Sequence, residues 1–247
     1  VSLVGSEMCI RDSSVTVHGY RRDYKSLGNR ELTAEQRVGA GRKQALRLGT
    51  YLDALMAGDW SGFWAPEFTP PYCFGFNFFD PRKSHLGPAL WRDLKLIRRY
   101  IPDWSTASKL PFLRQLLPGT GLMVHFGPAG THTPLHQDRF DVHSWLLNVV
   151  GRKRIILVDE AETAGVYRGR VDFDAPDFEV FPRAAAITPR QVVLGPGDLI
   201  YIPAGTWHEV TALEPSITLA CGFVNRSNAR RMIPHAWASL RSGLRRN

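Results

Sequence analysis

Cysteine is scarce in this sequence. The 247 residues include three cysteines, Cys9, Cys73 and Cys221, which lie far apart and follow no regular spacing. A disulfide framework or a cysteine-based zinc site needs more cysteines, placed at short and repeated intervals. The pattern therefore excludes both classes of site and is typical of a reducing compartment, so we expect a cytoplasmic protein.

Long apolar runs are also missing. Hydrophobic residues make up 44% of the chain and charged residues 22%, which is the ordinary balance of a soluble globular protein. No stretch approaches the roughly 20 apolar residues that a membrane-spanning helix requires. We therefore expect a soluble protein with no membrane partner.

Acidic residues are outnumbered by basic ones, and the formal net charge is +8. Part of the excess lies near the C-terminus, where it could attract nucleic acid or an acidic partner. A solvated basic helix face explains the same pattern, and no stripe of interleaved aromatic and basic residues accompanies it. Nucleic-acid binding is therefore the less favoured interpretation. The C-terminal arginines are Arg226, Arg230, Arg231, Arg241, Arg245 and Arg246.

The first thirteen residues differ in character from the rest. The stretch LVGSEMCIRDS, residues 3–13, resembles the in-frame translation of a transposase sequencing adapter. We therefore expect that Met8 is not a biological start and that residues 1–13 form no part of the folded core. No repeat or low-complexity linker divides the remainder, which predicts a single domain over residues 14–247.

The N-terminal half alternates helix and strand patterns. Residues 43–58 place apolar side chains at helical spacing and end at a glycine, which predicts an amphipathic helix. Residues 71–80 predict a strand with one buried aromatic face, formed by Tyr72, Phe74, Phe76 and Phe78. A second helix is predicted over residues 91–100.

After residue 118 the chain breaks into seven short apolar segments separated by glycine and proline turns. This texture predicts a β-sandwich or a small barrel, with its core at about residues 118–225. A C-terminal helix is predicted over about residues 233–246, and its apolar stripe would pack on the barrel or form a homodimer. The stripe consists of Ile233, Trp237, Leu240 and Leu244, and the seven segments read GLMVHFG, SWLLNVVG, KRIILVD, QVVLG, DLIYIP, HEVTAL and SITLACGF.

The stretch THTPLHQD, residues 131–138, carries the first candidate metal ligands. Residues two apart in a strand point to the same face, so His136 and Asp138 could bind one ion. A third ligand is available at His208, which follows the turns of GPGDLIYIPAGTWHEV, although alone it could be a satisfied histidine at a barrel mouth. Two imidazoles and one carboxylate, with further positions open, suit non-haem Fe(II).

These segments together resemble a known family. The sequences GPAGTHTPLHQDRFDVHSWLLNVVGRKRIILV and GPGDLIYIPAGTWHEVTALEPSITLACGF are similar to the JmjC-type, cupin-like 2-oxoglutarate- and Fe(II)-dependent oxygenases, over residues 121–223. The resemblance implies a mainly β protein with flanking helices, built on a double-stranded β-helix of the cupin or jelly-roll type. It also implies that His136, Asp138 and His208 bind iron, while His143, His125 and His132 are expected to be structural.

The cosubstrate is indicated by GRKRIILV, residues 151–158. Strand alternation places Lys153 on the apolar face with Ile155 and Leu157, and a buried ammonium is costly unless an anion meets it. The alternative is a lysine that reaches the barrel rim with its charged end in water. The family resemblance assigns Lys153 and Thr133 to the distal carboxylate of 2-oxoglutarate. At two further positions many relatives carry asparagine and glutamine, whereas this chain has Ser144 and Asn148, so their contact with the cosubstrate stays open.

The combined prediction is an Fe(II)/2-oxoglutarate-dependent dioxygenase that uses O₂ and releases succinate and CO₂. Its substrate would be a protein side chain or a small molecule, and we favour hydroxylation over demethylation because no reader-type or zinc module is attached. Two alternatives belong to the binding class, namely a non-catalytic cupin-fold protein that binds a ligand and a nucleic-acid-binding protein. The complete three-ligand set argues against the first, and the missing aromatic and basic stripe argues against the second.

Overall fold

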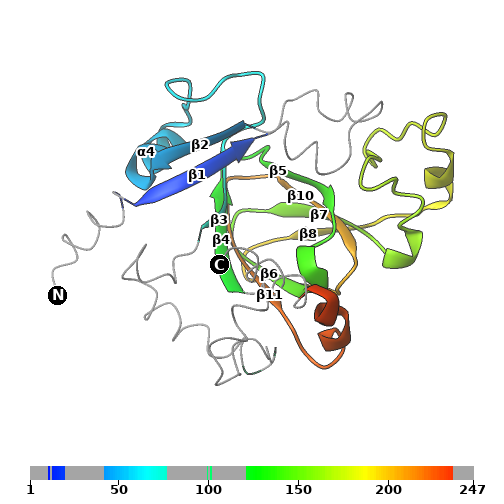
Figure 1. Cartoon of the computed structure of the whole chain (residues 1–247). Helices are drawn as coiled ribbons and strands as arrows, with labels where there is room; N and C mark the ends of the chain where they lie inside the picture. Colours follow the sequence, from blue (N-terminus) through cyan, green and yellow to red (C-terminus); the bar gives the residue numbers. More distant parts are fainter. Residues whose placement is uncertain are drawn as a thin grey trace, which may run out of the picture.

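The computed structural model describes residues 11, 13–19, 42–76, 99, 101 and 121–235. Eight strands form a barrel from two antiparallel sheets (Figure 1). One sheet contributes β4 (Gly121–Gly127), β11 (Ser216–Phe223), β6 (His143–Val150) and β9 (Leu199–Ile202), in that order. The other runs β5 (His132–His136), β10 (Trp207–Ala212), β7 (Lys153–Val158) and β8 (Arg190–Leu194).

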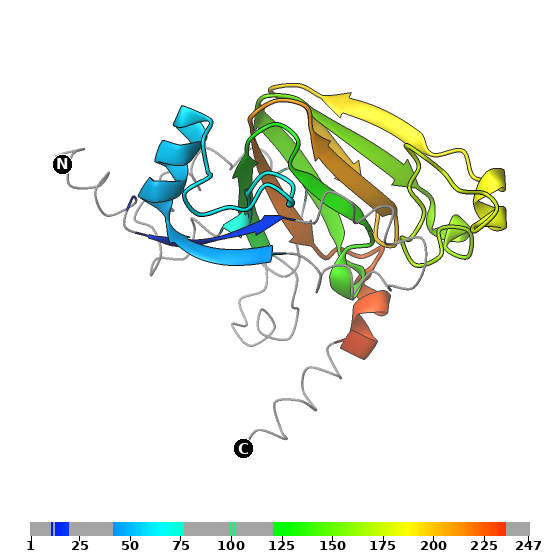
Figure 2. The same ribbon diagram turned by 90° about the horizontal axis from the view of Figure 1, so that it is seen from above.

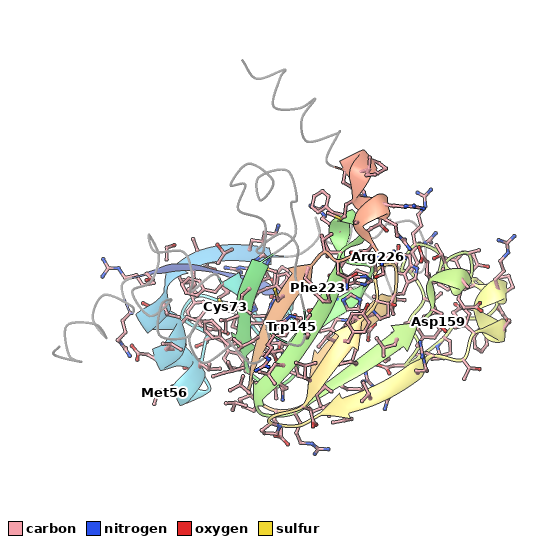
Figure 3. The ribbon with its side chains drawn as sticks, turned by 90° about the horizontal axis from the view of Figure 1, so that it is seen from below. Met56, Cys73, Trp145, Asp159, Phe223 and Arg226 are labelled. Carbon is pink, nitrogen blue, oxygen red and sulfur yellow. The ribbon has the colours of Figure 1, made fainter. Side chains whose placement is uncertain are left out.

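This pairing confirms the predicted fold class, a cupin or jelly-roll barrel with flanking helices. All seven apolar segments expected after residue 118 form strands, and β5 is an eighth. Inside the barrel, Ile155 and Val210 of the smaller sheet pack against Leu146 and Ile200 of the larger one, whereas Trp145 and Phe223 belong to a separate cluster with Leu122. Figure 3 shows Trp145 and Phe223 on the strands of the barrel.

The larger sheet continues beyond the barrel through β3 (Tyr72–Phe76), β1 (Ser14–Gly19) and β2 (Arg42–Arg47). Helix α4 (Leu48–Ala57) packs on this extension, as Figure 2 shows from above. The buried side chains of β1, Val15 and Val17, share a core with Tyr51 and Trp64. The extension is therefore part of the same folded unit as the barrel.

The predicted helix over residues 43–58 begins too early. Residues 42–47 pair with β1 along its whole length, and their burial alternates as in a half-buried strand. Six residues of antiparallel pairing stabilise the extended form more than local helical propensity favours a helix. The predicted end is confirmed, because Gly58 adopts the left-handed conformation with φ 67° and caps α4.

The aromatic alternation predicted for residues 71–80 is also wrong in part. Gly75 has φ 73°, and the pairing of β3 with β4 slips between Cys73 and Phe76. This bulge turns Cys73 and Phe76 into the core and leaves Phe74 42% exposed on the opposite face with Tyr72. Phe78 lies outside the described residues.

Two segments flank the barrel away from the extension. Residues 159–189 form a long connection that contains the short helices η2 (Glu160–Glu162) and η3 (Pro182–Ala186), and it lies at the side opposite β1 and β2 (Figures 1 and 2). Residues 229–235 are helical and cover one end of the barrel, where Met232 packs on Val142 and Val224. No helix within the described ranges has the length and apolar character to cross a membrane.

Several predictions concern residues that the structure does not describe. Of the helix expected over residues 91–100 it describes Arg99 alone, and of the C-terminal stripe it describes Ile233, which is 53% exposed. Trp237, Leu240 and Leu244 lie outside the described residues, so the homodimer stays a prediction. Of residues 1–13 it describes two: Arg11 pairs with Asp53 at the surface, and Ser13 accepts a hydrogen bond from the backbone N–H of Leu48.

Candidate metal centre

Three predicted ligands converge at one end of the smaller sheet. His136 is the last residue of β5, and His208, near the start of β10, is its direct partner in the antiparallel register. Asp138 follows β5 in the turn before η1 (Arg139–Asp141), with extended backbone angles of φ −61° and ψ 139°. One carboxylate oxygen of Asp138 lies 3.9 Å from the Nε2 atom of each histidine, and the three ligand atoms lie within 4.8 Å of one another. We call these residues the metal centre.

Backbone carbonyl groups set the orientation of both imidazole rings. Nδ1 of His136 lies 2.7 Å from the carbonyl oxygen of Pro134, and Nδ1 of His208 lies 3.1 Å from that of Thr206. A carbonyl oxygen can only accept a hydrogen bond, so each ring donates from Nδ1 and keeps a free lone pair on Nε2. Both lone pairs are therefore available on the atoms that face Asp138.

The charges of the metal centre also suit a metal ion. Burial, followed by the proximity of His208, lowers the pKa of His136 to about 4. Burial by itself would raise the pKa of Asp138. The nearby His208 and His136 lower it by more, so the net change is downward. At neutral pH His136 is therefore neutral and Asp138 ionised, the states in which they bind metals. A donor set of two nitrogens and one oxygen without sulfur fits Fe(II) that keeps open positions.

The two loops that carry the ligands are joined by hydrogen bonds. Gln137, between two of the ligands, donates from Nε2 to the carbonyl oxygen of Gly205, three residues before His208, at 2.5 Å. Gly205 has φ 83°, and a side chain there would collide with the carboxylate of Glu160. The turn before His208 is thus held between Gln137 on one side and Glu160 on the other.

The C-terminal helical segment fixes the turn after Asp138. Phe140 and Asp141 both adopt left-handed backbone angles, with φ 64° and 52°, which non-glycine residues rarely do. Arg231 bonds to the carboxylate of Asp141 at 2.7 Å and to that of Glu160 at 2.8 Å. Asn228 donates to the carbonyl oxygen of Asp141, and His235 approaches its carboxylate at 2.9 Å. Residues 229–235 therefore connect the loops on both sides of the metal centre.

His143, the histidine nearest the ligands in sequence, has other partners. Its Nδ1 accepts hydrogen bonds from the Tyr201 hydroxyl and the backbone N–H of Ala204, both at 2.9 Å, and its Nε2 bonds to Ser227 at 2.7 Å. These contacts agree with the expected structural role, because they anchor the turn that leads to His208. His132 bonds to Thr211, and it too faces away from the three ligands.

A cavity of about 750 Å³ opens beside the metal centre. Both sheets line it, with Leu146 and Ala220 from the larger sheet and Val210 from the smaller one. His125 also lines the cavity, where it accepts a hydrogen bond from the backbone N–H of Gly75. Burial, then Lys153, lowers the pKa of His125 to about 3, so this wall of the cavity carries no charge from it. The volume is ample for a small organic acid together with part of a second molecule.

Lys153 lies in the same cavity, and no described residue supplies a counter-ion for it. Its side chain is 2% exposed, which rules out a lysine that extends to the rim, and burial lowers its pKa to about 7. In the described part of the chain its partner is neutral: Nζ donates to the Tyr72 hydroxyl at 3.1 Å and lies 5.2 Å from that ring's centre. Thr133 lines the cavity as well. We call Lys153, Tyr72 and Thr133 the lysine site.

Tyr72 is the functional candidate that the sequence analysis missed. It counted as one of several core aromatics, because its contact with Lys153 joins two different sheets and has no local sequence signal. Nothing in the sequence distinguishes Tyr72 from Phe76. The bulge at Gly75, which the structure shows, separates them and places Phe76 in the core.

Ser144 and Asn148, the two remaining candidates for contact with the cosubstrate, have different surroundings. Ser144 is buried in the cavity wall near Asp138, and its hydroxyl makes no hydrogen bond of ordinary geometry with the described residues. Asn148 is not among the residues that line the cavity. Its amide donates to the carbonyl oxygen of Gly151 at 2.6 Å and accepts from Thr218 at 3.0 Å, so its polar atoms are used by the fold. Ser144 therefore remains a candidate for ligand contact, whereas Asn148 has a structural explanation.

Comparison with known proteins agrees with this arrangement. The chain is 36% identical over 104 residues to Lysine-specific demethylase 8 of Xenopus tropicalis, covering 38% of this chain and 23% of that protein. It is 34% identical over 143 residues to Jumonji C domain-containing protein 5 of Drosophila melanogaster, covering 54% and 33%. It is 34% identical over 117 residues to the 2-oxoglutarate and iron-dependent oxygenase JMJD4 of Gallus gallus, covering 44% and 28%.

The matched regions are thus a minor part of those relatives, since the chain spans at most about a third of their length. The family of cupin-like domains matches residues 78–227, which is more than half of this chain and includes the metal centre and Lys153. With a jelly-roll barrel, a His-Asp-His cluster and relatives of the Jumonji C type, the chain belongs to the JmjC-type cupin-like family.

Proposed function

We propose that this protein is an Fe(II)- and 2-oxoglutarate-dependent oxygenase. The observation that carries the proposal is the pairing of two features in one cavity: three convergent metal ligands and a buried lysine without a counter-ion. A dicarboxylic acid can bind the metal with one end and neutralise Lys153 with the other. The similarity to a relative named for 2-oxoglutarate and iron supports the same choice.

In this proposal the metal centre holds Fe(II) through Nε2 of His136, Nε2 of His208 and the carboxylate of Asp138. Bound iron supplies the chemistry that inserts one oxygen atom of O₂ into a substrate C–H bond while the other enters succinate, with release of CO₂ from 2-oxoglutarate. The protein supplies ligands in the correct tautomer and protonation state before the metal arrives.

The lysine site holds the distal carboxylate of 2-oxoglutarate. Lys153 donates a charge-assisted hydrogen bond, and the hydroxyl groups of Tyr72 and Thr133 line the cavity beside it. Burial makes the ammonium a strong partner for an anion, since a buried charge is poorly solvated. Ser144, whose hydroxyl has no ordinary partner near Asp138, is positioned to donate to a ligand at the metal.

A non-catalytic cupin that only binds ligands is the alternative. It does not require the two free Nε2 lone pairs beside a carboxylate, and no described feature of the cavity favours it. We propose hydroxylation as the reaction, on a protein side chain or a small molecule.

The test begins without oxygen. Addition of Fe(II) and then 2-oxoglutarate to the metal-free protein should produce a visible metal-to-ligand absorption band, and admission of O₂ should release succinate. His136→Ala should lose the band. Asn148→Asp is not a suitable control, because Asn148 supports the fold. Arg190→Gln, a change of one exposed cation outside the cavity, is the matched control and should retain both signals. Absence of the band in folded wild-type protein would overturn the proposal.

A further inference from the structure

Two exposed cations line the cavity, and their side chains have no partners among the described residues. Lys43 lies on β2 directly opposite His18 of β1, and both line the cavity. Arg139 lines it from the other side, immediately after Asp138. Both Lys43 and Arg139 are exposed, and neither side chain makes a hydrogen bond or ion pair in the described structure. We call Lys43 and Arg139 the mouth cations.

Other cations on this surface are used differently. Arg42 also lines the cavity, but its guanidinium bonds to Gln44 and to the carbonyl oxygen of Phe63 and lies over the Trp64 ring. Arg231 is occupied by Asp141 and Glu160. The contrast indicates that the mouth cations are left free for something that enters the cavity.

Negative charge is nearly missing from the same lining. Among the described residues that line the cavity, Asp138 carries the sole carboxylate, and the metal centre uses it. Once 2-oxoglutarate pairs with Lys153, a lysine or arginine side chain held in this cavity would still meet Lys43 and Arg139, with no further carboxylate among the described lining residues. Like charges so arranged oppose binding, whereas an anion gains attraction from each of them.

An aromatic path leads from the mouth toward the metal centre. His18 contacts Phe74 at 6.1 Å between ring centres, and Phe74 contacts His125 at 4.5 Å. Phe74 is 42% exposed, so one face of its ring is open to a ligand. Aromatic walls of this kind hold the apolar part of a ligand while charged groups fix its end.

From these observations we propose that the substrate of this protein is an anion, bearing a carboxylate that the mouth cations bind while its apolar part lies along Phe74. The inference rests on the proposed oxygenase function and narrows its substrate class. It separates this chain from a relative whose name specifies lysine. The carboxylate can belong to an acidic side chain of a peptide or to a free organic acid.

The first experiment measures binding without turnover. Seven-residue fluorescent peptides with neutral flanks and a central Asp, Glu, Asn or Lys are titrated into the Fe(II)- and 2-oxoglutarate-loaded protein without oxygen, and a mixture of free aliphatic and aromatic carboxylic acids competes. Peptides with Asp or Glu should bind more tightly than the matched Asn and Lys peptides, or the free acids should bind in their place. The two arms identify the source of the carboxylate. Equal or tighter binding of the Lys peptide, or no binding of any acid, would overturn the proposal.

The second experiment assigns the effect to the mouth. In the double variant Lys43→Gln, Arg139→Gln, the dissociation constant of the best acidic probe should rise by about threefold to thirtyfold, as expected for two exposed ionic contacts. The double variant Arg152→Gln, Arg190→Gln, which also removes two positive charges but outside the cavity, should leave it unchanged. The affinity for 2-oxoglutarate should also be unchanged. If it falls as much as that of the probe, the mouth cations serve the cosubstrate and the proposal is wrong.

The order of the measurements separates this inference from the proposed function. The absorption band of the Fe(II) and 2-oxoglutarate complex is recorded first on the wild-type protein. If the band is missing, the oxygenase proposal fails. If it forms and acidic probes do not bind, the oxygenase proposal stands and the anionic substrate is excluded.

Discussion

At the metal centre the carboxylate of Asp138 lies 3.9 Å from two imidazoles, whereas at the lysine site the ammonium of Lys153 has a neutral phenol 3.1 Å away as its partner. Both groups line one cavity, where Lys153 is 2% exposed and the side chain of Asp138 is 30% exposed. The first arrangement lowers the cost of its charge before any ligand arrives, and the second does not. A buried charge left without a counter-charge indicates where an ionic ligand belongs.

Loss of a metal ligand should have the largest effect. In His136→Ala, Asp138→Ala or His208→Ala the dissociation constant for Fe(II) should rise at least about a hundredfold, since removal of an outer partner alone often costs tenfold or more. Equilibrium dialysis with Fe(II) under nitrogen measures it, and circular dichroism checks the fold. His143→Ala should be milder, because its partners are Ser227, Tyr201 and Ala204. A His143 variant as defective as the other three, beside an unaffected His208→Ala, would refute the ligand assignment.

The second-largest effect should come from removal of the Lys153 ammonium. Lys153→Ala deletes a charge-assisted contact, so the dissociation constant for 2-oxoglutarate should rise by about tenfold to a hundredfold. Iron affinity should change little, which distinguishes the two sites. Calorimetric titration of 2-oxoglutarate into the iron-loaded variant measures the change, and unaltered affinity would place the anchor on another cation.

Lys153 should also make the free energy of unfolding of the unliganded protein depend on pH. Its pKa is about 7 in the fold and 10.5 ordinarily, so between these values the unfolded chain binds a proton that the folded chain does not. Stability should therefore rise with pH in this window, by about 1 to 2 kcal/mol from pH 7 to pH 9, relative to Lys153→Met. Below pH 7 Lys153 is protonated in the folded protein as well, so the full free-energy cost of burying its charge is present. Urea unfolding of both proteins measures this, and saturating 2-oxoglutarate should remove the difference in slope.

A smaller effect is expected at the residues that hold the ligand loops. Arg231→Ala breaks the contacts with Asp141 and Glu160, and the strained turn after Asp138 loses part of its support. The dissociation constant for Fe(II) should rise by about threefold to tenfold, because the side chain is partly exposed and acts through other residues. Arg190→Ala breaks an exposed pair with Asp159 and should change nothing at the metal. Equal iron affinity in the two variants would show that the network does not position the ligands.

Deletion of residues 1–12 should have the smallest effect on either site. Arg11 makes an exposed ion pair with Asp53, and such pairs contribute little. Ser13, whose carbonyl oxygen bonds to Leu48, is retained. The melting temperature should stay within about 2 °C, and a much larger fall would show that the adapter-like segment supports the fold.

Much of the site could be predicted because its residues depend on short spacing. His136 and Asp138, two residues apart, reach the same site as expected. Strand β5 ends at His136, but Asp138 still has an extended backbone. The inward orientation of Lys153 follows from strand alternation, and the structure buries it. The pairing of His208 with His136 rests on family resemblance in the sequence, because long-range register has no local signal.

The failures have a common cause in contacts between distant segments. Residues 43–47 form a strand because β1 lies beside them, which their own periodicity does not reveal. Phe76 lies in the core, away from Tyr72 and Lys153, because a bulge at Gly75 changes the register of β3. For Asn148 the sequence left contact with the cosubstrate open, and its partners Gly151 and Thr218 are set by the folded barrel. Local patterns predicted the strands, whereas bulges and partners between strands required the structure.

The bonds from residues 228–235 to the turn after Asp138 have a consequence for local unfolding. A metal ion that binds only when this turn is ordered must, by thermodynamic linkage, stabilise the helical segment by part of its own binding free energy. Backbone amides of residues 229–235 should then exchange their hydrogens more slowly once iron is bound, although none of them touches the ion. The end of the described chain would thus report whether the metal centre is filled.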